Sequence, residues 1–248
     1  MIIDERMVTY INSLDTGHTP FLENLERTAK QDRVPIIRRE MQSFLKVFLK
    51  MKQPKRILEV GTAVGFSAVF MAQYGEPDAE ITTIENYEKR IPIARENFEK
   101  SGFADRITLI PGDAAEVLKT LDGPYDFIFM DAAKGQYIHF LPEVLRVLDK
   151  NGVLITDNVL QDGDVIESRF AVERRNRTIH KRMREYLFEL THNEGLLTSV
   201  VPLGDGIAIT MKSHDTRKET TREKTIVTNI LNLSIGTTML ASPSCKAR

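Results

Sequence analysis

The sequence predicts an α/β protein with a mostly parallel sheet that ends in an antiparallel hairpin. Three observations lead to this fold class. Short apolar runs alternate with amphipathic stretches between residues 56 and 148, which is typical of parallel strands joined by helices. Residues 1–50 show only helical periodicity. Two further strand-like runs flank Gly204-Asp205-Gly206, in which the Asp-Gly pair favours a tight turn.

Each element follows from its own pattern. Residues 1–50 are expected to form a helical cap, because apolar residues recur there every three or four positions. Pro35 interrupts this pattern, since proline disfavours helix in the residue before it. The expected strands lie near 56–60, 80–85, 106–110, 125–130 and 151–156, the expected helices near 66–75, 88–100, 114–120, 137–148 and 168–192, and the hairpin over 198–211.

We therefore expect one domain over residues 51–212 behind the helical cap. After Lys212 the chain becomes polar and charged and loses any sustained period, which predicts a disordered tail over 213–248. The composition is ordinary for a soluble protein, with 42% hydrophobic and 28% charged residues. The 34 Lys and Arg residues nearly balance the 35 Asp and Glu residues, so net charge does not indicate a nucleic-acid partner.

The compartment is predicted from the termini and the cysteine count. Cys245 is the single cysteine, which excludes an internal disulfide and favours a reducing compartment. The N-terminus lacks a basic region followed by a long apolar run, so no secretory signal is expected. No apolar stretch approaches the roughly 20 residues that span a bilayer. The expectation is a cytoplasmic protein without a membrane partner.

Polar side chains follow two of the predicted strands. Asp131 comes directly after strand 125–130, and Asp157 and Asn158 come after strand 151–156. The carboxyl ends of adjacent parallel strands converge on one crevice. Two carboxylates and an amide there supply oxygen ligands of the kind that Mg²⁺ prefers. Lys134 adds a potential base three residues after the first carboxylate.

A second group of residues predicts a cofactor loop. The segment 57–67 reads as a strand, a glycine turn and a helix start. The dinucleotide fingerprint would need glycine at positions 61, 63 and 66, but the chain has Gly61, Ala63 and Phe66, and the P-loop ending is also absent. A pyrophosphate ligand is therefore disfavoured.

Three acids at successive strand ends suggest what the loop binds. Glu59 lies beside the loop and suits a positive amine, Glu85 has the position of an acid for ribose hydroxyls, and Asp113 could reach an adenine amine. Any one of them could be a helix N-cap or a solvated acid. Together they favour an amine-bearing nucleoside without phosphate, such as S-adenosylmethionine.

Three motifs resemble the metal-dependent O-methyltransferases, the family of the catechol and caffeoyl-CoA enzymes. The motifs are residues 59–67, residues 131–137 and residues 156–159. The resemblance covers about residues 30–212. The resemblance is strongest to a bacterial branch of the family that methylates 5-hydroxyuridine at the tRNA wobble position. Segments 34–36, 52–55 and 202–206 also resemble that branch. The tail after Lys212 is not part of the family pattern.

The resemblance implies a Rossmann-like, seven-stranded class I methyltransferase sheet and a homodimer. It implies Asp131, Asp157 and Asn158 as ligands of Mg²⁺ or another divalent cation, with Lys134 and Asp131 at the catalytic centre. The residues that it implies for S-adenosylmethionine are Ile37 in a closing segment, Glu59, Gly61, Ser67, Glu85, Asp113, Ala114 and Asp131.

Methyl transfer requires a hydroxyl oxygen that has lost its proton and is aligned behind the sulfonium methyl. A divalent cation would stabilise that oxyanion. A nearby cation also favours the neutral form of Lys134, which is therefore the expected base. A lysine that only orients the substrate, or a surface lysine, is the alternative.

A basic cluster between Arg169 and Arg184 favours RNA as the substrate. It contains seven basic residues and one acid. The residues expected to bind RNA are Arg174, Arg175, Arg177, Lys181 and Arg184, most of them on the helix face opposite an apolar stripe. Such a face suits a phosphate backbone, and a flipped-out anticodon base would suit the crevice. A solvated helix face is the alternative explanation.

We expect an S-adenosylmethionine- and Mg²⁺-dependent O-methyltransferase that converts tRNA wobble 5-hydroxyuridine to 5-methoxyuridine, with the anticodon loop as its partner. Two alternatives stay open. One is an O-methyltransferase of a small catechol-like or acyl-CoA-linked phenol, which would need an apolar slot. The other is a non-catalytic S-adenosylmethionine-binding RNA module, which would not need Asp131, Lys134, Asp157 and Asn158.

Overall fold

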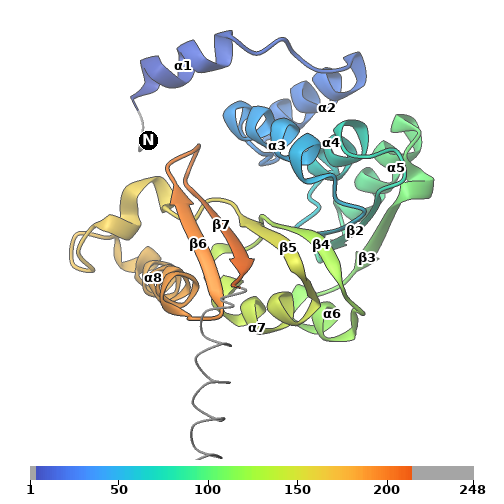
Figure 1. The fold of residues 1–248 in the computed structure, drawn as a ribbon. Helices are drawn as coiled ribbons and strands as arrows, with labels where there is room; N and C mark the ends of the chain where they lie inside the picture. The colour runs from blue at the N-terminus through green and yellow to red at the C-terminus, as the bar shows by residue number, and fades with distance from the viewer. Residues whose placement is uncertain (1–3, 214–248) are drawn as a thin grey trace, which may run out of the picture. The chain divides into compact units, whose positions relative to one another are not determined.

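The computed structural model describes residues 4–213 and contains a seven-stranded sheet with helices on both faces (Figure 1). The strand order is β3-β2-β1-β4-β5-β7-β6. The strands are β1 (Arg56–Val60), β2 (Glu80–Glu85), β3 (Ile107–Pro111), β4 (Tyr125–Met130), β5 (Leu148–Thr156), β6 (Leu196–Val201) and β7 (Ile207–Lys212). The pairs from β3 to β5 are parallel, and β7 pairs antiparallel with β5 and β6. The predicted sheet and its terminal hairpin are therefore confirmed.

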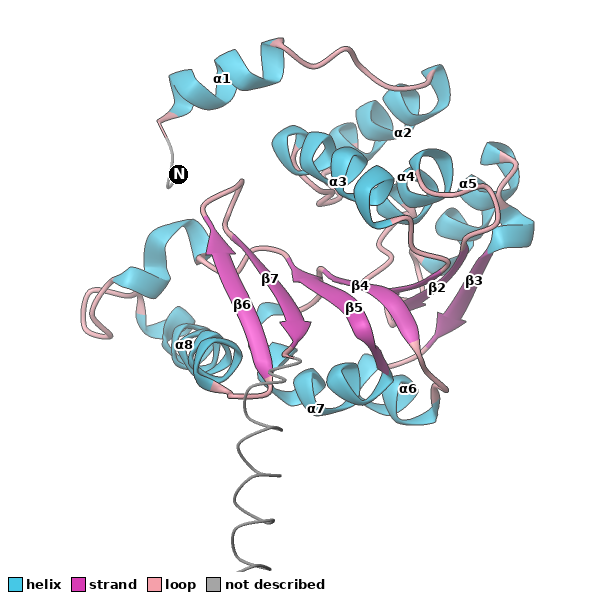
Figure 2. Ribbon diagram, in the orientation of Figure 1, coloured by secondary structure: helices cyan, strands magenta, loops and turns pink. Residues whose placement is uncertain are grey.

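Helices form the two outer layers (Figure 2). They are α1 (Glu5–Ser13), α2 (Pro20–Gln31), α3 (Arg39–Lys52), α4 (Phe66–Tyr74), α5 (Ile91–Ser101), α6 (Ala114–Thr120), α7 (Tyr137–Val147) and α8 (Arg177–His192). Helices α3, α4 and α5 cover one face of the sheet, and α6, α7 and α8 cover the other. Each face has its own apolar cluster, centred on Phe70 and Phe127 on the first face and on Tyr137 and Tyr186 on the second.

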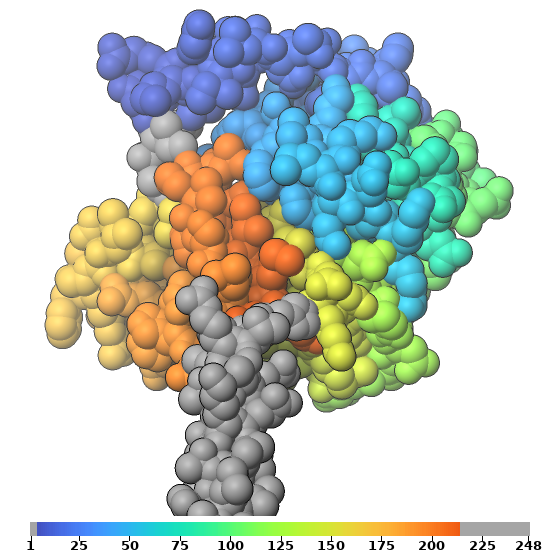
Figure 3. Space-filling view, in the orientation of Figure 1, coloured from blue at the N-terminus to red at the C-terminus, as the bar shows by residue number. Residues whose placement is uncertain are grey.

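The N-terminal region is helical as predicted, with interruptions before α2 and before α3. Helix α2 begins with Pro20, which suits the first helical position because that residue has no amide proton to satisfy. The Thr19 side chain caps the helix by accepting from the Leu22 amide. Helix α1 lies on the outside of the molecule, and none of its residues is buried (Figure 3).

The helix predicted over 168–192 is wrong at its start. Helix α8 begins at Arg177, after a short 3₁₀ turn over Arg174–Asn176. The stretch before it lacks an apolar stripe that could pack against the sheet, because Phe170 is 86% exposed and only Val172 is buried. Residues 168–176 therefore have too little apolar surface to bury for a helix to pack there.

The contacts between residues divide the chain into two units, with the boundary after Lys212. The predicted disordered tail lies outside the described residues, apart from Ser213. No helix within residues 4–213 is long and apolar enough to cross a membrane.

Candidate active site

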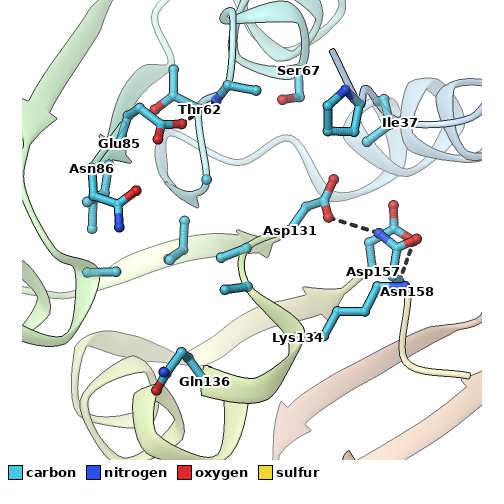
Figure 4. A pocket seen from close by; sticks show the side chains of 18 of the residues that line it. Ile37, Thr62, Ser67, Glu85, Asn86, Asp131, Lys134, Gln136, Asp157 and Asn158 are labelled. Carbon is cyan, nitrogen blue, oxygen red and sulfur yellow. Dashed lines mark hydrogen bonds between the residues drawn. The ribbon is translucent and has the colours of Figure 1, made fainter. Parts of the chain in front are cut away.

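A cavity of about 750 Å³ opens at the carboxyl ends of β1, β2, β4 and β5 (Figure 4). Its walls come from the turns after these strands, from the segment between α2 and α3, and from the hairpin turn before β7. This is the crevice that an open parallel sheet is expected to form. The volume lies in the range of pockets that enclose a whole small molecule.

The cavity brings together most of the residues that the sequence predicted. The predicted site residues that line it are Ile37, Gly61, Ser67, Glu85, Asp113, Ala114, Asp131, Lys134, Asp157 and Asn158. They come from segments up to 121 positions apart, between Ile37 and Asn158. Among the residues predicted for the cofactor, the metal and catalysis, Glu59 is the exception because it does not line the cavity, and none of the five predicted RNA-binding residues lines it.

The glycine loop after β1 depends on close backbone approach. Gly61 has a φ of +108°, which L-residues rarely adopt, and a Cβ there would collide with the Asp131 carbonyl oxygen. The Gly61 amide donates to the Ile84 carbonyl at 3.1 Å, and the Asp131 amide donates to the Val60 carbonyl at 3.0 Å. Gly61 is therefore required for β1, β2 and β4 to end side by side at the cavity.

Glu59 lies beneath this loop in the interior of the protein. It is fully buried, and its Oε2 accepts from the Thr83 hydroxyl at 2.5 Å. Burial raises its pKa to about 8, against the opposing effect of the Ser67 and Thr83 hydroxyls. Its Oε1 has no well-formed hydrogen bond within the described part of the chain, although Ser67 is near. Ser67 thus lies next to Glu59 and also lines the cavity, whereas Glu59 itself does not.

Glu85 and Asp113 have structural partners at the cavity wall. Glu85 accepts from the Ala63 amide at 2.7 Å and from the Tyr87 amide at 2.8 Å. Asp113 is the N-cap of α6 and accepts from the Ala115 amide at 2.8 Å. Each carboxylate is therefore oriented by backbone groups. Asp113 is therefore an N-cap, as the alternative explanation holds, and it also lines the cavity.

Asp131, Asp157 and Asn158 meet at the opposite end of the cavity. The Asn158 Nδ2 atom donates to Asp131 Oδ1 at 2.9 Å, and the Asn158 amide donates to Asp157 Oδ1 at 2.7 Å. Asn158 has a φ of +60°, a conformation that asparagine tolerates better than most residues. The three side chains are therefore directed to one point at the strand ends.

The electrostatics of this point favour a cation. Burial raises the pKa of Asp131, and burial and repulsion by Asp131 raise the pKa of Asp157 to about 7. A bound cation would offset both effects, because it compensates the charge of two buried carboxylates. Within residues 4–213, no group of three His, Cys, Asp or Glu side chains is arranged to hold a metal. The candidate ligand set therefore depends on Asn158 as its third member.

Lys134 has a partner that the sequence did not predict. Its Nζ donates to Asp205 Oδ2 at 2.8 Å, and Asp205 is 2% exposed. The Asp162 amide donates to the other carboxylate oxygen of Asp205. The sequence identified Asp205 only as a turn residue. Nothing in its local pattern could show that the hairpin turn reaches the strand ends of β4 and β5.

The basic cluster is arranged differently from the prediction. Arg174 and Arg175 precede α8, and Arg175 pairs with Glu173 at 2.7 Å. Arg177 donates to the Val172 carbonyl at 3.1 Å, and Arg184 donates to the Val165 carbonyl at 3.1 Å. Lys181 pairs with Glu185 at 3.6 Å. Arg177, Lys181 and Arg184 thus share one face of α8, Arg174 and Arg175 precede the helix, and Arg177 and Arg184 also hold the segment before it.

Known proteins with related sequences are O-methyltransferases. The chain is 30% identical to a catechol O-methyltransferase of Mycobacterium tuberculosis over 160 residues, or 63% of this chain and 73% of the relative. It is 31% identical to caffeoyl-CoA O-methyltransferase 5 of Nicotiana tabacum over 182 residues, or 67% of this chain and 72% of that relative.

Solved structures agree. A putative caffeoyl-CoA O-methyltransferase from Staphylococcus aureus superimposes with a TM-score of 0.75 at 31% identity, covering 84% of this chain and 98% of the other. The S-adenosylhomocysteine-bound Podospora anserina methyltransferase PaMTH1 gives a TM-score of 0.77 at 27% identity, covering 84% and 94%. The O-methyltransferase family model matches residues 12–213, and the chain belongs to this family.

Proposed function

We propose that the chain transfers a methyl group from S-adenosylmethionine to a hydroxyl oxygen with the help of a divalent cation, and that the acceptor is tRNA wobble 5-hydroxyuridine. The observation that carries the methyl-transfer chemistry is the shared cavity. It has acids suited to a nucleoside, Glu85 and Asp113, at one end and the cation-compatible Asp131 and Asp157 at the other.

The nucleoside end fits the cofactor. Glu85 and Asp113 are carboxylates held in place by backbone amides, so they can accept from ribose hydroxyls and from an adenine amine without reorganising. S-adenosylmethionine would supply an electrophilic methyl group on a sulfonium. The related PaMTH1 structure contains S-adenosylhomocysteine, the product of such a transfer.

The other end would activate the acceptor. A divalent cation held by Asp131, Asp157 and Asn158 would lower the pKa of an acceptor hydroxyl. Asp131 contributes to both ends, because its backbone packs against Gly61 and its side chain contacts Asn158. The cavity therefore aligns the two reactants through one short segment after β4.

Lys134 is the candidate residue for accepting the proton of the acceptor hydroxyl. Its ion pair with Asp205 requires the ammonium form, whereas a general base must be neutral. Proton acceptance therefore requires that Lys134 leave Asp205 when the cation and acceptor bind. If the ion pair persists, Lys134 instead donates to the developing oxyanion and orients it.

The RNA acceptor is proposed from an exposed segment that precedes α8. The segment after Asn158 exposes Phe170 between Arg169 and the pair Arg174 and Arg175. An aromatic ring among arginines suits an unpaired RNA loop, in which bases stack and phosphates pair with guanidinium groups. Helix α8 also contacts the Lys134 turn, since Arg182 Nη1 donates to the Gly135 carbonyl at 3.0 Å.

A small phenol is the second candidate. Two of the related proteins described above are named for catechol and caffeoyl-CoA. A catechol and 5-hydroxyuridine both present two adjacent oxygens to a cation, so the cation end of the cavity accommodates either. The two candidates differ in whether an extended basic surface contributes to binding.

The proposal is tested with purified protein, S-adenosylmethionine and three acceptors: tRNA containing 5-hydroxyuridine, catechol and caffeoyl-CoA. Mass spectrometry should detect 5-methoxyuridine in the tRNA, with a larger kcat/KM than for either phenol. Asp157→Ala should abolish turnover with Mg²⁺ and leave cofactor binding nearly unchanged, because Asp157 lies at the cation end only. Methylation of a phenol but not of tRNA would refute the RNA acceptor, and equal loss of turnover and cofactor binding would refute the cation site.

The surface residues give a matched comparison. Replacing both Arg174 and Arg175 by alanine should weaken tRNA binding and reduce its salt dependence, because each phosphate contact releases counterions. The fold should be unaffected, since both side chains are exposed. Arg177→Ala should instead lower stability, because Arg177 holds the Val172 carbonyl. An unchanged salt dependence in the double variant would contradict an RNA contact at this surface.

A further inference from the structure

The segment of residues 34–38 forms one wall of the cavity without belonging to a helix or strand. It joins α2 to α3, and Ile37 and Arg38 are among the residues that line the cavity. The peptide groups of such a segment need partners outside regular structure. The partner of the Ile37 carbonyl comes from α3, where Gln42 Nε2 donates to it at 2.8 Å.

Gln42 is fully buried and is held from its other side by His18. Gln42 Oε1 lies 2.7 Å from His18 Nε2. An amide oxygen only accepts, so His18 Nε2 carries the proton of this bond. His18 Nδ1 lies 3.1 Å from the Tyr74 hydroxyl, so the ring bridges Gln42 and Tyr74. The bonds form a relay between Tyr74 at the end of α4 and Ile37 at the cavity wall.

The His18 and Gln42 side chains at the centre of the relay are shielded from solvent. The His18 side chain has no exposed surface, and its ring packs edge-on against Phe70 with the centroids 5.2 Å apart. Burial raises the pKa of Tyr74, so its hydroxyl stays protonated at neutral pH. Losing one buried bond would leave its partner unsatisfied, so the bonds reinforce a single geometry.

None of the three relay side chains lines the cavity, yet the relay ends on a residue that does. We propose that Gln42 and His18 are positioning residues that hold the Ile37 peptide at the cavity wall and thereby set the affinity for S-adenosylmethionine. The inference rests on the proposed cofactor site. It extends that site to a cluster built from the α1–α2 loop, α3 and α4, which the sequence did not single out.

A purely structural role would have a different signature. Loss of a buried bond would then lower the free energy of unfolding without a selective effect on the cofactor. The comparison therefore needs a variant of the same helix that loses packing but no hydrogen bond to residues 34–38. Leu45 is such a residue, since it is fully buried and does not line the cavity.

The experiment compares Gln42→Met, Tyr74→Phe and the control Leu45→Val with the wild type. Gln42→Met keeps the length of the side chain and removes both of its hydrogen bonds. Calorimetric titration with S-adenosylmethionine alone should show a Kd raised about tenfold for Gln42→Met, raised less for Tyr74→Phe, and unchanged within twofold for Leu45→Val. In the cofactor-free protein, amides of residues 34–38 should exchange hydrogen faster in Gln42→Met than in the control.

The outcomes separate the two proposals. A Kd that is unchanged in Gln42→Met, or raised equally in Leu45→Val, overturns the relay. Failure of the wild type to bind S-adenosylmethionine overturns the proposed cofactor site instead. In that case unchanged hydrogen exchange in Gln42→Met would also refute the claim that the relay holds residues 34–38. Selective loss of affinity with faster exchange supports it.

Discussion

Glu59 is a carboxyl group without access to solvent, and this gives the fold a pH dependence. Burial raises its pKa from an ordinary value of 4.5 to about 8. Between these values the folded state keeps a proton that the unfolded state has lost, so stability falls as pH rises from about 4.5 to about 8. Below about pH 4.5 Glu59 is protonated in both the folded and the unfolded state, so its ionisation no longer changes the stability.

Glu59→Gln should remove this part of the pH dependence. The amide oxygen can still accept from Thr83, while the amide has no proton to lose at neutral pH. Urea unfolding at pH 5 and pH 8 should show that the free energy of unfolding changes less between these pH values in the variant than in the wild type. The difference should be several kcal/mol, since each unit of pKa shift corresponds to about 1.4 kcal/mol. Asp131 and Asp157 contribute equally to the pH dependence of the wild type and of the variant. The same change in stability between pH 5 and pH 8 in both proteins would therefore contradict a neutral Glu59.

Asp205 should matter for the rate and not for the cofactor. Asp205→Asn keeps an oxygen for the Asp162 amide and loses the ion pair with Lys134. Because a small displacement of a reacting group is costly, kcat should fall about tenfold or more while the Kd for S-adenosylmethionine stays the same. If the two residues act together, Lys134→Met combined with Asp205→Asn should cost no more than Lys134→Met alone. Additive losses in this cycle would show that the two side chains act independently.

At the scale of elements, the strand ends matter more than the strands themselves. Gly61 can be tested against Gly163, which has a similar φ of +101° but open space around its Cα. Gly163→Ala should cost on the order of 1 kcal/mol of stability through backbone strain alone. Gly61→Ala should cost clearly more and weaken binding of both cofactor and cation, because the new Cβ displaces Asp131. Equal effects of the two substitutions would show that the contact with Asp131 is unimportant.

The elements also show where periodicity predicts structure well. The parallel strands were predicted within three residues at each end. The signal is clearest for β1 and β4, whose residues are mostly apolar and buried. The prediction failed at the start of α8, which begins nine residues after the predicted position 168. Charge pattern carries little information about helix formation when no apolar stripe accompanies it, as around Phe170.

At the scale of the molecule, α1 contacts α3 but buries none of its own residues. Met7, Tyr10, Ile11 and Leu14 are between 47% and 66% exposed. A helix of nine residues is not stable alone, so its apolar side chains need a partner. We propose that the partner is a second copy of the chain, which agrees with the homodimer expected from the sequence.

Sedimentation equilibrium should therefore show a dimer for the wild type. Ile11→Glu should shift the equilibrium toward monomer, because it places a charge among the exposed apolar residues of α1. Thr9→Glu, an exposed position of the same helix, provides the control and should remain dimeric. A wild type that is monomeric at micromolar concentration would refute the proposed interface.

The sequence by itself determined the α/β fold, the order of its elements and the identity of the residues that end each strand. These are local properties, since apolar periodicity and strand-end side chains are read along the chain. Only the tertiary structure decided that Glu59 lies beneath the cavity, that Asp205 pairs with Lys134, and that His18 and Gln42 support Ile37. These contacts join distant segments, and no local pattern specifies which buried polar groups the packing of helices and turns will bring together.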